Sequence, residues 1–201
     1  MGCGGNCGSG SRLGILGFTE INELIDQGVI EFADRSSVNP SSLNVTLGET
    51  FLVEARDDNT VTGVSYHPLE YSKRESPRFV SIDGGVMLRP GAFCLASLKE
   101  KINLPSDIAC HVMLRSSAAR MGIEHLLAGW ADPGYSGHLT LELKNMQQFN
   151  AVHLRTGDQV MQLIFHRVYD VPADRTYDKV SGKYSGVTGP QGVKREHAVK
   201  S

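Results

Sequence analysis

The strongest constraint on the fold is a succession of short apolar or β-branched segments separated by turn-forming residues. Many short strands at this spacing predict a mainly β protein, a sandwich or a barrel, with only short helices. The segments span residues 43–47, 50–53, 61–64, 79–82, 92–98, 109–114, 138–144, 152–154 and 160–168. The turns between them are marked by Asp57-Asp58-Asn59, Asp83-Gly84-Gly85, Pro90-Gly91, Pro105-Ser106-Asp107, Asp132-Pro133-Gly134 and Thr156-Gly157-Asp158.

Two short helices interrupt the strand pattern. The first follows Phe18, where Thr19 can act as the N-cap, Ile21, Leu24 and Ile25 share one face, and Gly28 can end the helix. The second follows residue 114: Ser116 or Ser117 can cap one or two turns that Gly122 ends. Both glycines are expected at helix ends because glycine adopts positive φ without steric cost.

The charge balance argues against a polyanionic partner. The chain has 201 residues, 40% of them hydrophobic, and a formal net charge of -2, so no overall positive field attracts nucleic acid or anionic lipid. No stretch approaches the roughly 18 apolar residues of a membrane helix, and the Gly-rich start lacks the apolar segment of a signal peptide. We therefore expect a cytoplasmic protein that binds neither nucleic acid nor membrane.

Composition divides the chain into a leader at residues 1–12, a β domain at 13–171 and a tail at 172–201. The leader holds Cys3 and Cys7, but no neighbouring His or further Cys pair completes a metal-ligand set, so we predict a flexible leader and no metal site. Cys94 and Cys110 are the other cysteines, too few for a disulfide framework in a chain of this length. The tail has six Lys or Arg against three acids and little apolar content, so it cannot form a core of its own.

Three features are candidates for chemistry, each with a plainer interpretation. Leucines alternate with Glu142 along residues 138–144, so Glu142 lies off the core, as a solvated surface acid or as a catalyst. Arg and Ser side chains gather at the start of the second helix, where they could bind phosphate or merely cap the helix; they are Arg115, Ser116, Ser117 and Arg120. Asp132 lies in a tight turn, where Asp is usually a turn residue.

Other enzyme signatures are absent from the sequence. It contains no GxxxxGK[ST] loop, no GxGxxG fingerprint, no HExxH pair and no GxSxG elbow. No H-x-E is matched by a P-C-x-x-C, so any deamination by this chain is expected to proceed without zinc.

Read in order, three segments resemble the dCTP deaminase family, which shares its fold with trimeric dUTPases. They are RSSAARMGIEHLLAGWADPGYSGHLTLELKN, LRTGDQVMQLIF and KYSGVTGPQG, and the resemblance extends over residues 16–195. It implies a distorted double-sheet β barrel of the dUTPase-like β-clip type, assembled as a homotrimer with active sites at the subunit interfaces. It also implies that the C-terminal tail closes over the bound nucleotide.

The resemblance further implies the reaction and the residues that carry it. The reaction is hydrolytic deamination of dCTP to dUTP and ammonia, with Mg2+ bound to the triphosphate, no zinc, and dTTP as a feedback inhibitor. Glu142 is the implied general acid and base, Arg120 and Ser116 assist catalysis, and Asp132 holds the deoxyribose or its water. The implied nucleotide contacts are Arg115, Ser116, Ser117, Arg120, Asp132, Thr140, Leu141, Glu142, Gln162, Tyr177 and Lys183.

Departures from the family pattern leave alternatives open. The Gly129-Trp130 pair resembles members that both deaminate dCTP and hydrolyse dUTP to dUMP, whereas single-function members carry basic residues there. Leu127 replaces a Thr and Val187 replaces a Gln that contacts nucleotide, which leaves open a non-catalytic nucleotide-binding regulator. A dUTPase that uses Asp132 to activate water is the remaining alternative, although plain dUTPases lack an acid at the position of Glu142.

Overall fold

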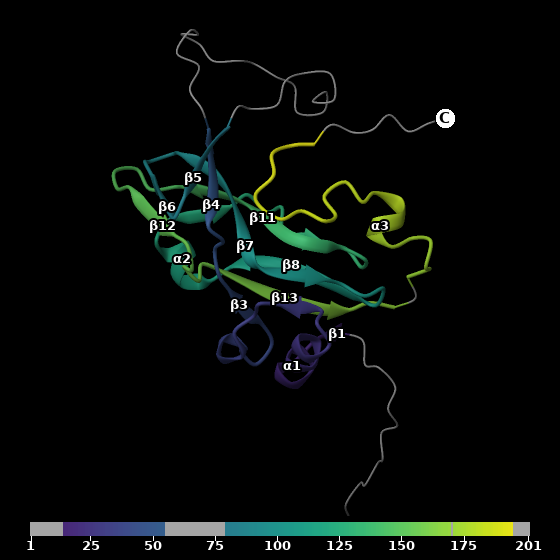
Figure 1. Ribbon diagram of the computed structural model, residues 1–201. Helices are drawn as coiled ribbons and strands as arrows, with labels where there is room; N and C mark the ends of the chain where they lie inside the picture. Colours follow the sequence, from purple (N-terminus) through teal and green to yellow (C-terminus); the bar gives the residue numbers. More distant parts are fainter. Residues whose placement is uncertain (1–13, 55–78, 170, 195–201) are drawn as a thin grey trace, which may run out of the picture.

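The computed structural model describes residues 14–54, 79–169 and 171–194, and within them strands dominate (Figure 1). Antiparallel strands form two main sheets and one small one. The first sheet runs β1 (Gly14–Ile15), β13 (Met161–Arg167), β8 (Ile108–Leu114) and β10 (Trp130–Ala131), with β3 (Leu43–Val45) also on β13. The second runs β5 (Phe79–Asp83), β4 (Thr50–Glu54), β7 (Phe93–Asn103), β11 (Ser136–Asn145) and β9 (Ile123–His125), with β2 (Ile30–Glu31) on β7. The small sheet pairs β12 (Val152–Arg155) with β6 (Gly85–Leu88).

The two main sheets enclose a single apolar core, as the alternating sequence pattern predicts. On β11 the side chains of Leu139, Leu141 and Leu143 are buried while their neighbours are partly exposed. Phe165 of β13 and Phe51 of β4 are fully buried in the same cluster. Each fully buried side chain of this size contributes about 2 kcal/mol from the burial of apolar surface. The mainly β, double-sheet prediction is therefore confirmed.

Most predicted strands are found close to their expected bounds. The segment at 61–64 and the turn at 57–59 lie outside the described residues. The strands that the sequence reading missed are short or have a polar face: β1, β2, β6, β9 and β10 have two to four residues each. Segments of this length carry too little periodicity to be recognised without their partners.

Helix α1 (Phe18–Asp26) begins two residues earlier than predicted. Its N-cap is Gly17, not Thr19, and the backbone N–H of Gly17 donates to Oε2 of Glu20 at 3.2 Å. Its end is as predicted, since Gly28 has a φ of +72°. The helix buries Ile21 and Leu24 and lies beyond β3 at one end of the molecule (Figure 1).

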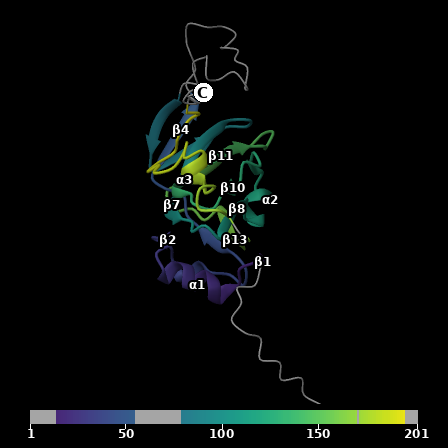
Figure 2. The same ribbon diagram turned by 90° about the vertical axis from the view of Figure 1, so that its right-hand side faces the viewer.

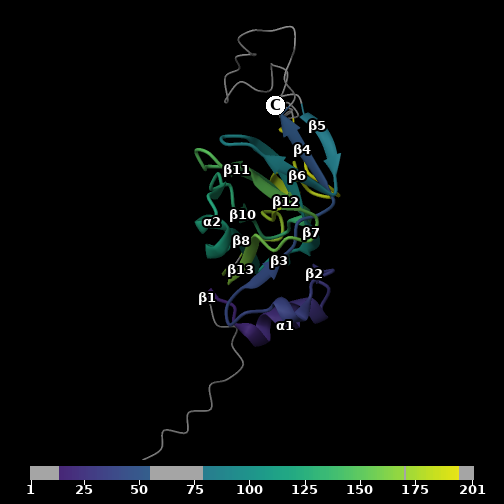
Figure 3. The ribbon, with the colours of Figure 1, turned by 90° about the vertical axis from the view of Figure 1, so that its left-hand side faces the viewer.

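The short helix α2 (Ser116–Arg120) also differs from the prediction at its start. Its N-cap is Arg115, and no side chain caps it, so neither serine has the capping role expected for it. Gly122 follows the helix with a φ of +78°, as predicted. Figure 3 shows α2 on the side of the molecule opposite β4 and β5.

The C-terminal segment lies against the barrel. This segment contains the short helix α3 (Tyr177–Val180), which the sequence did not predict. A 3-10 turn, η1 (Arg35–Ser37), lies between β2 and β3. Figure 2 shows α3 beside β11. None of the helices among the described residues is long and apolar enough to cross a membrane.

Candidate active site

Glu142 lies on β11, on the face opposite the buried leucines. Its side chain is 29% exposed, and Oε2 lies 3.4 Å from Nε2 of His125, whose side chain is only 5% exposed. Within the described part of the chain, neither of these two buried atoms has a hydrogen-bond partner. A carboxylate oxygen thus faces an imidazole nitrogen in a place shielded from water, so Glu142 is not a fully solvated surface acid and becomes a candidate for chemistry.

His125 is a candidate site residue that the sequence patterns did not reveal. It is the last residue of β9, where its backbone pairs with Leu143 of β11, and its Nε2 lies 3.4 Å from Oε2 of the neighbouring Glu142. The three-residue strand gives no periodicity from which this pairing could be predicted. The presence of a histidine in a segment shared with the family was the available signal.

The predicted Arg and Ser cluster consists of residues of α2 and its N-cap. Ser116, Ser117 and Arg120 are exposed. Arg115 is held to the barrel, because its guanidinium donates from Nη1 to the backbone oxygen of Gln159 at 2.8 Å. Helix α2 packs against β9. Strand β9 therefore lies next to both groups, because its His125 contacts Glu142, although no hydrogen bond or ion pair among the described residues joins the cluster to Glu142 directly.

Asp132 is exposed in the turn that follows β10. Its Oδ1 accepts a hydrogen bond from Nε1 of Trp130 at 2.8 Å. The turn also touches the tail, since the N–H of Tyr177 donates to the backbone oxygen of Pro133 at 2.8 Å. The predicted sugar-binding residue is therefore brought close to the predicted lid.

Three of the predicted nucleotide contacts lie in the tail or touch it. The ring of Tyr177 lies 5.6 Å from that of Tyr135, and its hydroxyl accepts from the N–H of Tyr184 at 3.0 Å. The ammonium of Lys183 lies 5.5 Å from the centre of the Tyr184 ring. Thr140 of β11 accepts a hydrogen bond on Oγ1 from the N–H of Gln191 at 3.2 Å.

Two predicted contacts have restricted roles in the structure. The side chain of Leu141 is fully buried in the core, so only its backbone is available to a ligand. Gln162 lies on β13 in the other main sheet, where its Nε2 donates to the backbone oxygen of Leu114 at 3.3 Å. Neither side chain lies beside Glu142 within one chain.

The described residues contain no group of three or more His, Cys, Asp or Glu side chains that could hold a metal ion. Cys94 and Cys110 are buried free thiols. Burial raises the pKa of Cys94 to about 12 and raises that of Cys110 as well, so both remain protonated and unreactive at neutral pH.

Comparison with known proteins gives a consistent result. The profile of the dCTP deaminase-like family matches residues 15–168. The dCTP deaminase of Natronomonas pharaonis is 37% identical over 188 residues, 88% of this chain and 92% of that protein. A dUMP-forming dCTP deaminase of Methanosphaera stadtmanae is 32% identical over 188 residues, 89% of this chain and 92% of that protein.

A solved structure has the same fold. The 2'-deoxycytidine 5'-triphosphate deaminase from Agrobacterium tumefaciens aligns with a TM-score of 0.61 and 22% identity, covering 77% of this chain. This chain spans about half, 48%, of the length of that protein.

Proposed function

Because the chain belongs to the dCTP deaminase-like family, we propose that it catalyses the hydrolytic deamination of dCTP to dUTP and ammonia. The observation that carries the proposal is the pair formed by Glu142 and the buried His125, 3.4 Å apart. Its substrate is the complex of dCTP with Mg2+, in which the triphosphate oxygens hold the ion, as Mg2+ prefers.

Glu142 moves the protons in this reaction. Its carboxylate takes a proton from a water molecule while the water oxygen bonds to C4 of cytosine, and the carboxyl group returns that proton to N3. The hydroxyl proton on C4 then passes through Glu142 to the amino group, the C–N bond breaks, and ammonia leaves as the C4 carbonyl forms. His125 orients the carboxylate from the side away from the substrate.

The remaining contacts come from α2, the turn after β10 and the tail. Ser116, Ser117 and Arg120 bind the phosphates, since a guanidinium matches phosphate oxygens with a fork of donors. Asp132 accepts a hydrogen bond from the deoxyribose hydroxyl, and Lys183 and Tyr177 cover the nucleotide. The family resemblance implies a homotrimer with active sites at the subunit interfaces, and the exposed side chains of Ser116, Ser117 and Arg120 are accessible to a second copy.

The test is a product assay. The full-length protein with Mg2+ and dCTP is expected to release ammonia and form dUTP, and dTTP is expected to inhibit. Glu142→Gln should bind dCTP but release no ammonia, because the amide keeps the shape and cannot shuttle a proton. Glu31→Gln is the matched control, since Glu31 on β2 has a similar side-chain exposure of 36% and lies outside the site. Tight binding of dCTP or dTTP without turnover by the parent protein would instead indicate a non-catalytic regulator.

A second activity, hydrolysis of dUTP to dUMP and pyrophosphate, has its own support. The Gly129-Trp130 pair lies beside Asp132, and the Methanosphaera stadtmanae relative is named as dUMP-forming. In this reaction Asp132 would activate the water that attacks the α-phosphate. Pyrophosphate release from dUTP that survives Glu142→Gln and is lost in Asp132→Asn would establish it, and formation of dUTP as the final product would exclude it.

A further inference from the structure

The residue before β10, the strand that leads to Asp132, lies very close to β8 of the first sheet. A Cβ placed on Gly129 would lie 2.2 Å from the backbone oxygen of Val112, so no other residue fits there without moving the backbone. The N–H of Val112 donates to the backbone oxygen of Gly129 at 2.7 Å, and Trp130 then pairs with His111 of β8. The close approach at Gly129 therefore fixes the backbone position of Trp130 relative to β8.

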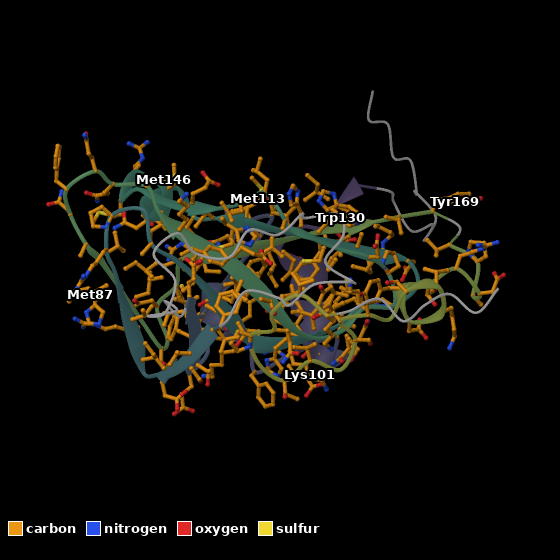
Figure 4. All side chains as sticks on the ribbon, turned by 90° about the horizontal axis from the view of Figure 1, so that it is seen from above. Met87, Lys101, Met113, Trp130, Met146 and Tyr169 are labelled. Carbon is orange, nitrogen blue, oxygen red and sulfur yellow. The ribbon has the colours of Figure 1, made fainter. Side chains whose placement is uncertain are left out.

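Two histidines hold the indole ring of Trp130 in place. The ring of His111 meets it edge-on with 6.0 Å between centroids, and the ring of His166 on β13 lies 5.8 Å away. The two histidines are themselves 6.3 Å apart, so the three rings form one cluster on the outer face of the first sheet. Figure 4 shows Trp130 on the same edge of the molecule as Met113, Met146 and Tyr169, with Lys101 on the opposite edge.

The clustered ring points its only donor at the carboxylate of Asp132. The indole Nε1–H donates to Oδ1 at 2.8 Å, although both residues are exposed and Asp132 could otherwise rotate freely. With Oδ1 engaged by a fixed donor, the lone pairs of Oδ2 are directed away from the ring. An acceptor whose rotation is already restricted loses less conformational freedom when it binds a ligand hydroxyl.

We propose that Trp130 is a positioning residue that orients Asp132 so that Oδ2 accepts a hydrogen bond from the 3′-hydroxyl of the nucleotide sugar. The inference rests on the proposed function, because it takes the ligand to be a deoxynucleoside triphosphate. Trp130, acting through Asp132, would then make the site select for the sugar, so that dCTP binds more tightly than 2′,3′-dideoxy-CTP. A tyrosine or phenylalanine at this position would keep the ring contacts and lack the indole N–H.

The test measures the affinities of dCTP and 2′,3′-dideoxy-CTP by calorimetry on the full-length protein in the Glu142→Gln background, where turnover does not interfere. Trp130→Phe is expected to weaken the binding of dCTP about fivefold and to leave the binding of 2′,3′-dideoxy-CTP almost unchanged, because only dCTP has the 3′-hydroxyl. In an Asp132→Ala background the same substitution should have no further effect. Tyr169→Phe, another exposed aromatic residue on the same edge, is the control and should change neither affinity.

The outcomes separate the two proposals. Equal weakening of both nucleotides by Trp130→Phe, or an undiminished effect without Asp132, would overturn the positioning role and leave the proposed function intact. Absence of ammonia release when the parent protein is given dCTP would overturn the proposed function and, with it, the premise of this inference. Thermal unfolding of each variant shows whether a loss of affinity comes instead from a loss of fold.

Discussion

The two ends of β11 are covered along the same edge by two very different segments. At residues 143–145 the partner is β9, a strand of the barrel, and there Glu142 meets the buried His125. At residues 136–138 the partner is the tail: Gly137 forms a parallel bridge with Val187, and the N–H groups of His138 and Gly186 close the contact at 2.8 and 2.7 Å.

The two ends of β11 therefore differ in how firmly their partners are held. The end that holds the proposed acid and base is formed by two paired strands of the barrel. The end beside the tail depends on a segment that has no core of its own and is anchored by the side chain of Val187, which is 5% exposed. Opening the tail therefore costs far less than opening the barrel.

The largest effect is expected at the barrel end. His125→Asn removes the Nε2 atom that faces Glu142, so kcat for ammonia release should fall about a hundredfold while KM changes little, since the effect falls on proton transfer. Steady-state kinetics on dCTP measure both. His153→Asn, on the exposed side of β12, is the control. A rise in KM with kcat unchanged would show that His125 contributes to ligand binding and not to proton transfer.

The next effect is expected at the tail end. At Gly137 the φ is +144°, and a Cβ would lie 3.0 Å from the N and 3.1 Å from the O of Val187. Gly137→Ala should displace the tail and raise KM for dCTP about tenfold, with limited proteolysis cutting the tail first. Gly157→Ala supplies the control for backbone strain alone, because Gly157 has a φ of +84° and open space around it. If both variants gave the same KM, the tail contact would have no part in binding.

A smaller change concerns the anchor itself. Val187→Gln places an amide where an apolar side chain is buried, at a cost of about 1–2 kcal/mol. The amide protons of His138 and Gly186 should then exchange with solvent about tenfold faster, while those of β9 keep their rates. Unchanged exchange at the two amides would mean that the backbone bonds, rather than Val187, hold the tail.

The smallest effect is a pH dependence that should spare both ends of β11. Burial, and then the neighbouring His111, lower the pKa of His166. A histidine whose pKa is lowered on folding contributes stability above its unfolded pKa of about 6.5, and that stability is lost as the pH falls through the lowered value. Thermal unfolding should therefore show a decline in acid that His166→Gln weakens. The tail amides should not follow it.

Much of the fold follows from local patterns in the sequence. The alternation of leucines predicts which face of β11 is buried, and it correctly predicts that Glu142 lies off the core. Gly28 and Gly122 end their helices as expected, because positive φ is a property of the residue and its nearest neighbours. The strands with two to four residues could not be predicted, since they are strands only by virtue of their partners.

The candidate site is less accessible to the same reasoning. The sequence identifies Glu142 and the Arg and Ser cluster at α2 as candidates. It does not predict that Nε1 of Trp130 donates a hydrogen bond to Asp132 or that Arg115 donates one to Gln159. Such contacts depend on which rotamers packing allows, and local spacing does not encode rotamers.

By itself, then, the sequence determines a β protein, the faces of its longer strands, the ends of its helices and a tail that needs another surface to rest on. Only the tertiary structure decides that His125 is the partner of Glu142 and that Val187 anchors the tail beside Gly137. Apolar periodicity determines which side of a strand is buried, whereas the pairing of distant segments and the packing of their side chains determine which side chains meet.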